Sequence, residues 1–157
     1  MHEPVMDARS VETFLRAEFP QMYLDGDVFS VGTIEPGSVT VGFEPTDRHL
    51  RPGGTVSGPT LFTLADVTAY IAVLAHVGPV ALAVTTNLNI NFLHRPTPGR
   101  LACRGTILKL GKRLVIVDCV TTDADGRLVA QATGTYSIPP RQNDGNLIPQ
   151  QRTPSFR

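Results

Sequence analysis

The sequence predicts an α+β protein in which one antiparallel sheet packs against a single long, buried helix. A run of 21 residues, from Gly58 to Gly78, is almost entirely apolar and has the length of a long helix. After it the apolar period changes from 3.6 to 2, and strand-like runs separated by turn signals follow to about residue 138. Strands joined by tight turns form an antiparallel sheet, and a helix this apolar must be buried against it.

The segment before the long helix predicts a short helix and a hairpin. The stretch SVETFLRAEFP begins at Ser10, a suitable N-cap, and Pro20 ends it. Two strands are expected at 28–35 and 38–44, since the EPGS between them is typical of a hairpin turn. A Gly- and Pro-rich loop then leads to the long helix, and Pro59 suits its first position because a missing N–H costs nothing there.

Four more strands are expected after the helix, at 81–94, 101–110, 114–121 and 128–138. The first alternates an apolar face with an asparagine face: Leu88, Ile90 and Phe92 against Asn87, Asn89 and Asn91. The last has one face made mostly of small residues: Leu128, Ala130, Ala132, Gly134 and Tyr136. The long helix can pack closely against such a face.

The length of 157 residues suggests one domain, which we place at 1–140. The tail 141–157 is polar and contains proline, so we expect it to be flexible or to lie over a neighbour. The formal net charge is zero, which gives no general attraction to nucleic acid or to an anionic membrane. Polar residues within the apolar run also favour a buried helix over a membrane span.

The two cysteines indicate a reducing, cytoplasmic setting. Cys103 and Cys119 lie in strand-like runs and form no CxxC pair, so a disulfide framework is not expected. The N-terminus has no apolar segment of the kind a signal peptide needs. A structural role is expected for both thiols, although Cys119 would be a candidate nucleophile if a histidine lay beside it.

Several chemistries are not supported by the motifs. No metal site is expected, because the histidines at 2, 49, 76 and 94 form no ligand spacing such as HxH or HExxH. The run around Ser57 is GTVSGP rather than GxSxG, and no GxGxxG is present. The stretch GTILKLGKR has the wrong glycine spacing for a phosphate-binding loop.

Asp66 is the residue that most needs an explanation, because burying an unpaired carboxylate in an apolar helix is costly. It could be a structural residue held by hydrogen bonds, or a base or nucleophile in an apolar cavity. Thr63 and Tyr70, three residues before and four after it, lie on the same helix face and could be its hydrogen-bond partners in either case.

The start of the same helix offers a second candidate. The N–H groups of Gly58 and Thr60 lie at the helix N-terminus, where the helix dipole favours negative charge, so they could form an oxyanion hole. The alternative is an ordinary Gly-Pro helix start with no catalytic role. Asp66 lies eight residues beyond Gly58, which is about 12 Å along a helix. One carbonyl group cannot contact both from one chain, so a joint function predicts a homodimer with the site at the interface.

The ordered set of motifs resembles the hot-dog fold and, within it, the small acyl-CoA thioesterases of the phenylacetyl-CoA thioesterase type. The matching stretches are SGPTLFTLAD, AVTTNLNINFLHRP, LGKRLVIVDC and DGRLVAQATGTYSIP, between about residues 48 and 138. The resemblance implies a curved antiparallel sheet around the central helix, and pairing of two subunits into a homodimer or a homotetramer. It also implies hydrolysis of an acyl-CoA without a cofactor.

The resemblance further implies three roles. Asp66 activates water or attacks the thioester, the Gly58 N–H polarises the carbonyl, and Thr85 helps to hold the water. The chain departs from the family where relatives commonly have His-Gly-Gly, since it has Ser57-Gly58-Pro59, and where many have an asparagine it has Arg51. A non-catalytic acyl-CoA or small-ligand binding protein of the same fold is therefore the alternative.

The remaining candidates concern substrate binding. Lys112 and Arg113, with Lys109, form a basic cluster that could bind coenzyme A phosphates or could be only a solvated turn. Arg95 is another candidate for binding the phosphates. Ser57 and Arg51 replace family residues beside the carbonyl site. Phe62 and Tyr70 could line an apolar acyl pocket shared across the interface, although core packing is the simpler expectation for Phe62.

Overall fold

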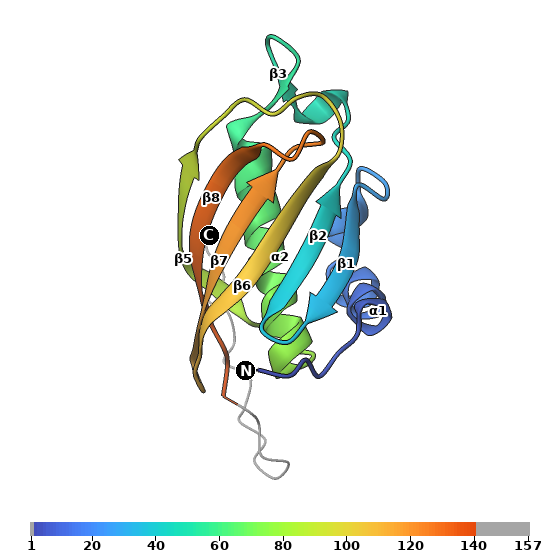
Figure 1. Ribbon diagram of the computed structural model, residues 1–157. Helices are drawn as coiled ribbons and strands as arrows, with labels where there is room; N and C mark the ends of the chain where they lie inside the picture. The colour runs from blue at the N-terminus through green and yellow to red at the C-terminus, as the bar shows by residue number, and fades with distance from the viewer. Residues whose placement is uncertain (1, 141–157) are drawn as a thin grey trace, which may run out of the picture.

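In the computed structural model, which describes residues 2–140, a six-stranded sheet wraps around one long helix (Figure 1). Every pairing is antiparallel, and the strand order is β1-β2-β6-β7-β8-β5. The helices are α1 (Ala8–Glu18) and α2 (Gly58–Val77), with short 3-10 turns η1 (Pro20–Tyr23) and η2 (Asp47–His49). The sheet strands are β1 (Phe29–Glu35), β2 (Ser38–Phe43), β5 (Val84–Phe92), β6 (Leu101–Leu110), β7 (Leu114–Thr122) and β8 (Leu128–Ser137).

The α+β prediction is confirmed, with small differences at the boundaries. A two-stranded ribbon, β3 (Leu50–Arg51) with β4 (Thr55–Val56), occupies the loop before α2 and was not predicted. The expectation that Ser10 caps α1 is wrong. Asp7 is the N-cap, and its Oδ1 accepts the Ser10 N–H at 2.8 Å. Asp is an equally good cap and comes first along the chain. The expected tail 141–157 lies outside the described residues.

Close packing of α2 on the sheet depends on small residues, as the β8 pattern predicted. A Cβ added to Gly134 of β8 would lie 3.5 Å from the Cβ of Ala69. On β6, a Cβ added to Gly105 would lie only 3.0 Å from Cγ2 of Thr68. The helix therefore lies so close to the sheet that a Cβ at Gly105 would be crowded and one at Gly134 would already be in van der Waals contact.

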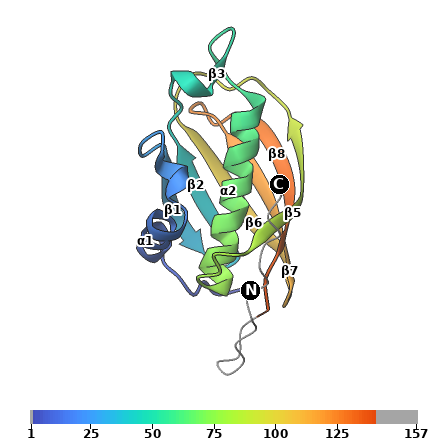
Figure 2. The ribbon, with the colours of Figure 1, turned by 180° about the vertical axis from the view of Figure 1, so that it is seen from behind.

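The two halves of α2 are covered differently. Residues 67–76 are all buried. The N-terminal segment of the chain helps to cover them, since the N–H groups of Val5 and Met6 donate to the Ala75 carbonyl at 2.7 and 3.2 Å. Nearer its start, Phe62 is 41% exposed and Thr63 is also exposed. Figure 2 shows this face of α2 between α1 on one side and β5 on the other. The end of α2 is therefore covered in part by the N-terminal segment of the same chain.

The helix α2 has the length and apolar composition of a membrane span, but it is buried in the protein. Among the described residues, α2 alone is long and apolar enough to cross a membrane, but 72% of its most apolar window is buried inside the protein. This burial is what a core helix under a sheet shows, as the polar residues in the run predicted.

Asp123 closes the turn that leads from β7 into β8, the strand that contacts Asp66. Its Oδ2 accepts the Thr97 N–H at 3.1 Å, and its Oδ1 accepts the N–H groups of Asp125 and Arg127, both at 3.0 Å. The hydrogen bond from the Thr97 backbone, with those from Arg127 and Asp125, lowers the pKa of Asp123. The turn is therefore stabilised by the ionised carboxylate.

We expect Asp123→Asn to lower the thermal unfolding temperature at pH 7, because an amide replaces one accepting oxygen with a donor. A carboxyl group with a lowered pKa in the folded state stabilises the fold above its unfolded pKa, about 3.9. That contribution is lost as pH falls through the lower, folded value. Calorimetric unfolding from pH 7 down to pH 3 should show the gap between wild type and variant shrinking; a gap independent of pH would contradict this role of the charge.

Candidate active site

Asp66 is half-buried on α2, and two hydroxyl groups bind the same one of its carboxylate oxygens. Thr85 Oγ1 on β5 donates to Asp66 Oδ1 at 2.6 Å, and the Tyr136 hydroxyl on β8 donates to that oxygen at 2.8 Å. The Tyr136 hydroxyl also lies 3.0 Å from the Asp66 backbone carbonyl. None of the ion pairs among residues 2–140 involves Asp66. The carboxylate is thus held by neutral donors and has no counter-ion within the described chain.

Thr85 reaches Asp66 because of a bulge in β5. Thr85 pairs with Tyr136, but Asn87 already pairs with Thr135, so Thr86 is an extra residue in the strand. In a regular strand Thr85 would share a face with Asn87, away from the helix. The bulge reverses this alternation and turns Thr85 toward α2. The bulge therefore brings Thr85 to Asp66, and the role in holding water that the resemblance implies for Thr85 stays a prediction.

Tyr136 is a site residue that the sequence reasoning missed. It was assigned only to the small-residue face of the last strand. Burial and the neighbouring negative charge of Asp66 raise the pKa of Tyr136 far above its usual range, so its hydroxyl stays protonated and can donate. A signal was present: Tyr136 is the one large polar side chain on a face that otherwise packs against the helix.

The predicted hydrogen bonds from Thr63 and Tyr70 to Asp66 are wrong. The Thr63 hydroxyl donates to the Pro59 carbonyl at 3.0 Å, one turn back along α2. The Tyr70 hydroxyl donates to the Ala81 carbonyl at 3.3 Å. A spacing of three or four residues brings side chains to one helix face, but each of these hydroxyls has an acceptor of its own nearby.

Asp66 opens into a pocket of about 390 Å³ between α2, β5 and the end of α1. Tyr70 and Tyr136 stack in it with ring centroids 6.1 Å apart and planes 17° apart, and Phe19 meets Tyr70 edge-on at 6.1 Å. Tyr70 thus lines the pocket that holds Asp66, and its role in an acyl pocket shared across an interface stays a prediction. A second pocket of about 320 Å³ shares Phe19, Thr63 and Val67 with the first, so the two pockets adjoin, and we call them together the groove.

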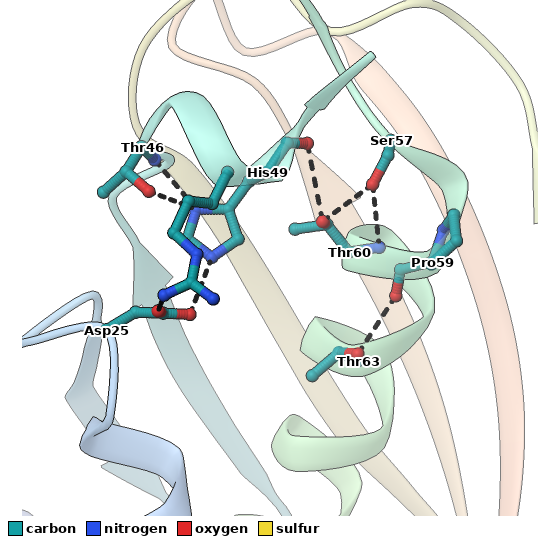
Figure 3. A network of polar contacts seen from close by, with 8 residues as sticks. Asp25, Thr46, His49, Ser57, Pro59, Thr60 and Thr63 are labelled. Atoms are coloured by element: carbon teal, nitrogen blue, oxygen red, sulfur yellow. Dashed lines mark hydrogen bonds and ion pairs between the residues drawn. The ribbon is translucent and has the colours of Figure 1, made fainter.

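The start of α2 is held in place by a polar network (Figure 3). Ser57 is the N-cap: its hydroxyl accepts the Thr60 N–H at 3.3 Å and lies 2.8 Å from the Thr60 hydroxyl. The Ser57 N–H donates to the His49 carbonyl at 2.8 Å. Thr60 is therefore not a free oxyanion donor, contrary to expectation. The Gly58 N–H has no acceptor among residues 2–140.

His49 has a structural role in this network. Its Nδ1 accepts the Thr46 N–H at 2.8 Å, and its Nε2 lies 3.7 Å from Asp25 Oδ2 (Figure 3). Through these contacts the imidazole fixes the loop before α2.

Gly58 faces a pocket of its own, about 490 Å³ in volume, at the start of α2. The ring of Phe92 lies over it, and a Cβ added to Gly58 would lie 3.3 Å from Phe92 Cζ. Phe92 is 55% exposed, whereas Leu88 and Ile90, the other apolar residues of the same predicted face, are half-buried. Three basic side chains line this pocket: Arg51, His94 and Arg95.

Asp66 and Gly58 are separated within one chain. Their pockets share no lining residue, and eight residues of helix between them correspond to about 12 Å. A single reacting group in one chain cannot contact both. This separation agrees with the prediction from sequence spacing.

Three other predicted substrate-binding residues lie elsewhere. Lys112 and Arg113 line a pocket of about 600 Å³ with His76 and Val77, at the far end of α2 from Gly58, about 30 Å along a helix of 20 residues. Arg113 Nε donates to the Ile138 carbonyl at 3.1 Å. Phe62 is exposed and lines none of the pockets described above, so core packing, its simpler expectation, is wrong.

The two thiols are placed as the structural role expected for them requires. Cys103 and Cys119 are buried and free, and Cys119 Sγ donates to the Ala65 carbonyl at 3.5 Å. The contact with Cys103, together with burial, raises the pKa of Cys119. In the part of the chain that the structure describes, no three His, Cys, Asp or Glu residues are grouped as metal ligands.

Comparison with known proteins decides the family. The model of the family described as "Thioesterase superfamily" matches residues 53–130, which include Gly58, Asp66 and Thr85. A Saccharolobus solfataricus protein named "Putative esterase SSO2140" is 31% identical over 127 residues, covering 81% of this chain and 88% of its own length. The chain belongs to the thioesterase superfamily. Membership supports thioester or ester hydrolysis as its activity.

Solved structures agree with membership in the superfamily. A crystal structure from Silicibacter sp. TM1040, described as a "putative thioesterase", is 44% identical with a TM-score of 0.78, covering 88% of this chain and 96% of that chain. A Streptococcus pneumoniae protein described as a "hypothetical thioesterase protein with coenzyme A" is 22% identical with a TM-score of 0.69, covering 85% of this chain and 99% of that chain. The hot-dog fold is thereby confirmed.

Proposed function

We propose that this member of the thioesterase superfamily hydrolyses a small or medium acyl-CoA, as enzymes of the phenylacetyl-CoA thioesterase type do, at a site built by two subunits. The observation that supports this most is the Asp66 carboxylate, which opens into a pocket with no ion-pair partner among residues 2–140 and is held by the Thr85 and Tyr136 hydroxyls. A carboxylate of this kind suits a general base or a nucleophile. No metal or organic cofactor is required.

The proposed reaction begins when the partner subunit supplies a Gly58 N–H to the thioester carbonyl oxygen. With Asp66 as base, the carboxylate takes a proton from water, whose oxygen bonds to the carbonyl carbon. The C–S bond then breaks, and the leaving thiolate recovers the proton from Asp66. With Asp66 as nucleophile, its oxygen bonds to that carbon and the thiolate leaves. Water then hydrolyses the resulting anhydride to the acid product and a protonated Asp66, which gives its proton to the thiolate. Both routes give a carboxylic acid and a thiol, and the Gly58 N–H stabilises the oxyanion in each.

The exposed surface favours a second copy of the chain as the partner. β5 is an edge strand, and a row of apolar side chains lies exposed along it and on α2: Phe62 at 41%, Leu82 at 76%, Val84 at 56%, Phe92 at 55% and Leu93 at 44%. An uncovered edge strand with apolar neighbours is suited to pairing with another strand. In the proposed homodimer, or a tetramer of two such dimers, β5 meets its copy and Asp66 of one chain lies near Gly58 of the other.

The pockets suit the two ends of an acyl-CoA. Arg51, His94 and Arg95 in the Gly58 pocket supply cationic or polar groups that fit coenzyme A phosphates better than the distant Lys112 and Arg113. The coenzyme A bound to the S. pneumoniae neighbour supports the same ligand. The groove beside Asp66 has apolar walls for the acyl group. The free, buried thiols fit a cytoplasmic enzyme.

A panel of acyl-CoA esters tests the activity. Acetyl-, hexanoyl-, phenylacetyl- and palmitoyl-CoA are incubated with the wild-type protein, and released thiol is followed with a chromogenic reagent. We expect catalytic thiol release from at least one ester of small or medium size. The rival function, a non-catalytic binding protein of this fold, predicts saturable binding by calorimetry with no thiol release, and that result would overturn the proposal.

A further inference from the structure

The donor arrangement around Asp66 distinguishes its two carboxylate oxygens. Both hydroxyls, Thr85 Oγ1 at 2.6 Å and Tyr136 OH at 2.8 Å, donate to Oδ1. Oδ2 accepts no hydrogen bond from residues 2–140, although Asp66 lines the pocket. An oxygen with two donors has its lone pairs occupied and its charge partly neutralised, so the other oxygen is the stronger base and nucleophile.

We propose that Tyr136 is a positioning residue for Asp66, which, together with Thr85, fixes Oδ1 and leaves Oδ2 as the oxygen that reacts. This inference rests on the proposed function. It adds a residue from β8, outside the segment 53–130 that the family model matches, and it assigns different roles to the two oxygens of Asp66.

The geometry of Tyr136 suits this role. Its hydroxyl lies 2.8 Å from Asp66 Oδ1 and 3.0 Å from the backbone carbonyl of the same residue, so one donor links the side chain and the main chain of Asp66. Its ring is buried, only 3% exposed, and stacks on Tyr70. A phenol held in this way cannot follow a rotating carboxylate, and it therefore restricts the carboxylate to one rotamer.

Thr85 and Tyr136 act as one unit because the sheet places them opposite each other. They are register partners on neighbouring strands, and the bulge after Thr85 turns its hydroxyl to the side of the Tyr136 ring. If one donor is removed, the other holds Oδ1 less firmly. If both donors are removed, the carboxylate is free to turn. The fold-loss of kcat in the double variant should therefore exceed the product of the two single fold-losses.

The test measures kcat and KM separately for Tyr136→Phe, Thr85→Val and the double variant, with an acyl-CoA that the wild type hydrolyses. Tyr136→Phe keeps the ring, so we expect kcat to fall about 10- to 100-fold while KM stays within about twofold. Thr85→Val should behave similarly, Thr85→Ser should restore most of kcat, and the double variant should lose more than the product of the single losses. Tyr23→Phe, a Tyr-to-Phe change outside these pockets, is the control and should leave both constants unchanged.

A wild-type kcat in Tyr136→Phe, or a double variant that loses only the product of the single effects, overturns the inference. Should Tyr136→Phe fail to fold, Thr85→Val and Thr85→Ser remain decisive, because a wild-type kcat in Thr85→Val contradicts the shared hold on Oδ1. Asp66→Asn is measured in the same assay. If Asp66→Asn is fully active, the proposed function itself fails; if it is inactive and Tyr136→Phe matches wild type, only this inference fails.

Discussion

Asp66→Asn is expected to lower kcat for acyl-CoA hydrolysis by about 10²- to 10⁴-fold, the usual contribution of a general acid–base group. The amide has nearly the shape of the carboxylate, and its carbonyl oxygen can still accept hydrogen bonds from Thr85 and Tyr136. It can neither take a proton from water nor attack a thioester. The loss should therefore appear in kcat, with the fold and substrate affinity retained.

Steady-state kinetics with thermal unfolding on the same samples would measure this effect. The chain offers a matched control in Asp118→Asn, because Asp118 on β7 accepts a hydrogen bond from Gln131 Nε2 at 2.8 Å and lines none of the pockets described above. We expect that variant to keep wild-type kcat. An Asp66→Asn protein that folds and retains more than about half of the wild-type kcat would show that the carboxylate is structural.

Gly58→Pro is expected to lower kcat by about 10²- to 10³-fold, since it removes the N–H assigned to the oxyanion. The backbone is compatible with proline at this position. Ser57 is extended at ψ 152°, as the residue before a proline prefers, and Gly58 is the first residue of α2, where proline is common. The helix should therefore still begin at the same place.

Gly58→Ala is the matched control for that variant. Both substitutions add a Cβ that would lie 3.3 Å from Phe92 Cζ, but only alanine keeps the N–H. The difference in kcat between the two variants thus isolates the hydrogen bond from the steric effect. Equal activity in Gly58→Ala and Gly58→Pro would contradict the oxyanion role.

The pattern of apolar residues was enough to predict the architecture. The change of period after α2 located the strands β5 to β8, and the small residues on the last strand correctly predicted close helix packing, as Gly134 and Ala69 show. These features depend on local periodicity and side-chain size. The cap of α1 was misplaced because Asp7 and Ser10 are both good N-caps, and propensity alone does not separate them.

The candidate site was predictable only in part. Asp66 stands out as a carboxylate in an apolar helix, and Gly58 as an N–H donor at the start of that helix. Their separation of eight residues can be read from the sequence without knowing the fold. Tyr136 contacts Asp66 across 70 residues of sequence, and the bulge that turns Thr85 inward reverses the expected alternation. Such contacts are set by register, which the sequence pattern does not specify.

The phosphate-binding prediction depends on the fold in the same way, and it stays a prediction. Lys112 and Arg113 form a basic cluster in the sequence, but the β6–β7 turn lies at the far end of α2 from Gly58. Arg51 and Arg95, 44 residues apart, line one pocket instead. Which end of a sheet a turn occupies depends on strand order, so a cluster found along the sequence need not lie near the site.

The central claim is that Asp66 of one chain works with Gly58 of another, and co-expression of two inactive variants tests it directly. One chain carries Asp66→Asn and the other Gly58→Pro, with different purification tags so that mixed oligomers can be isolated. Each mixed dimer has one site with both defects and one with neither.

Random pairing makes about half of the dimers mixed, so the unfractionated sample should recover about a quarter of wild-type kcat per site, and the isolated mixed dimer about half. Each variant alone should stay at its low value. A mixed dimer no more active than its parents would contradict the shared site.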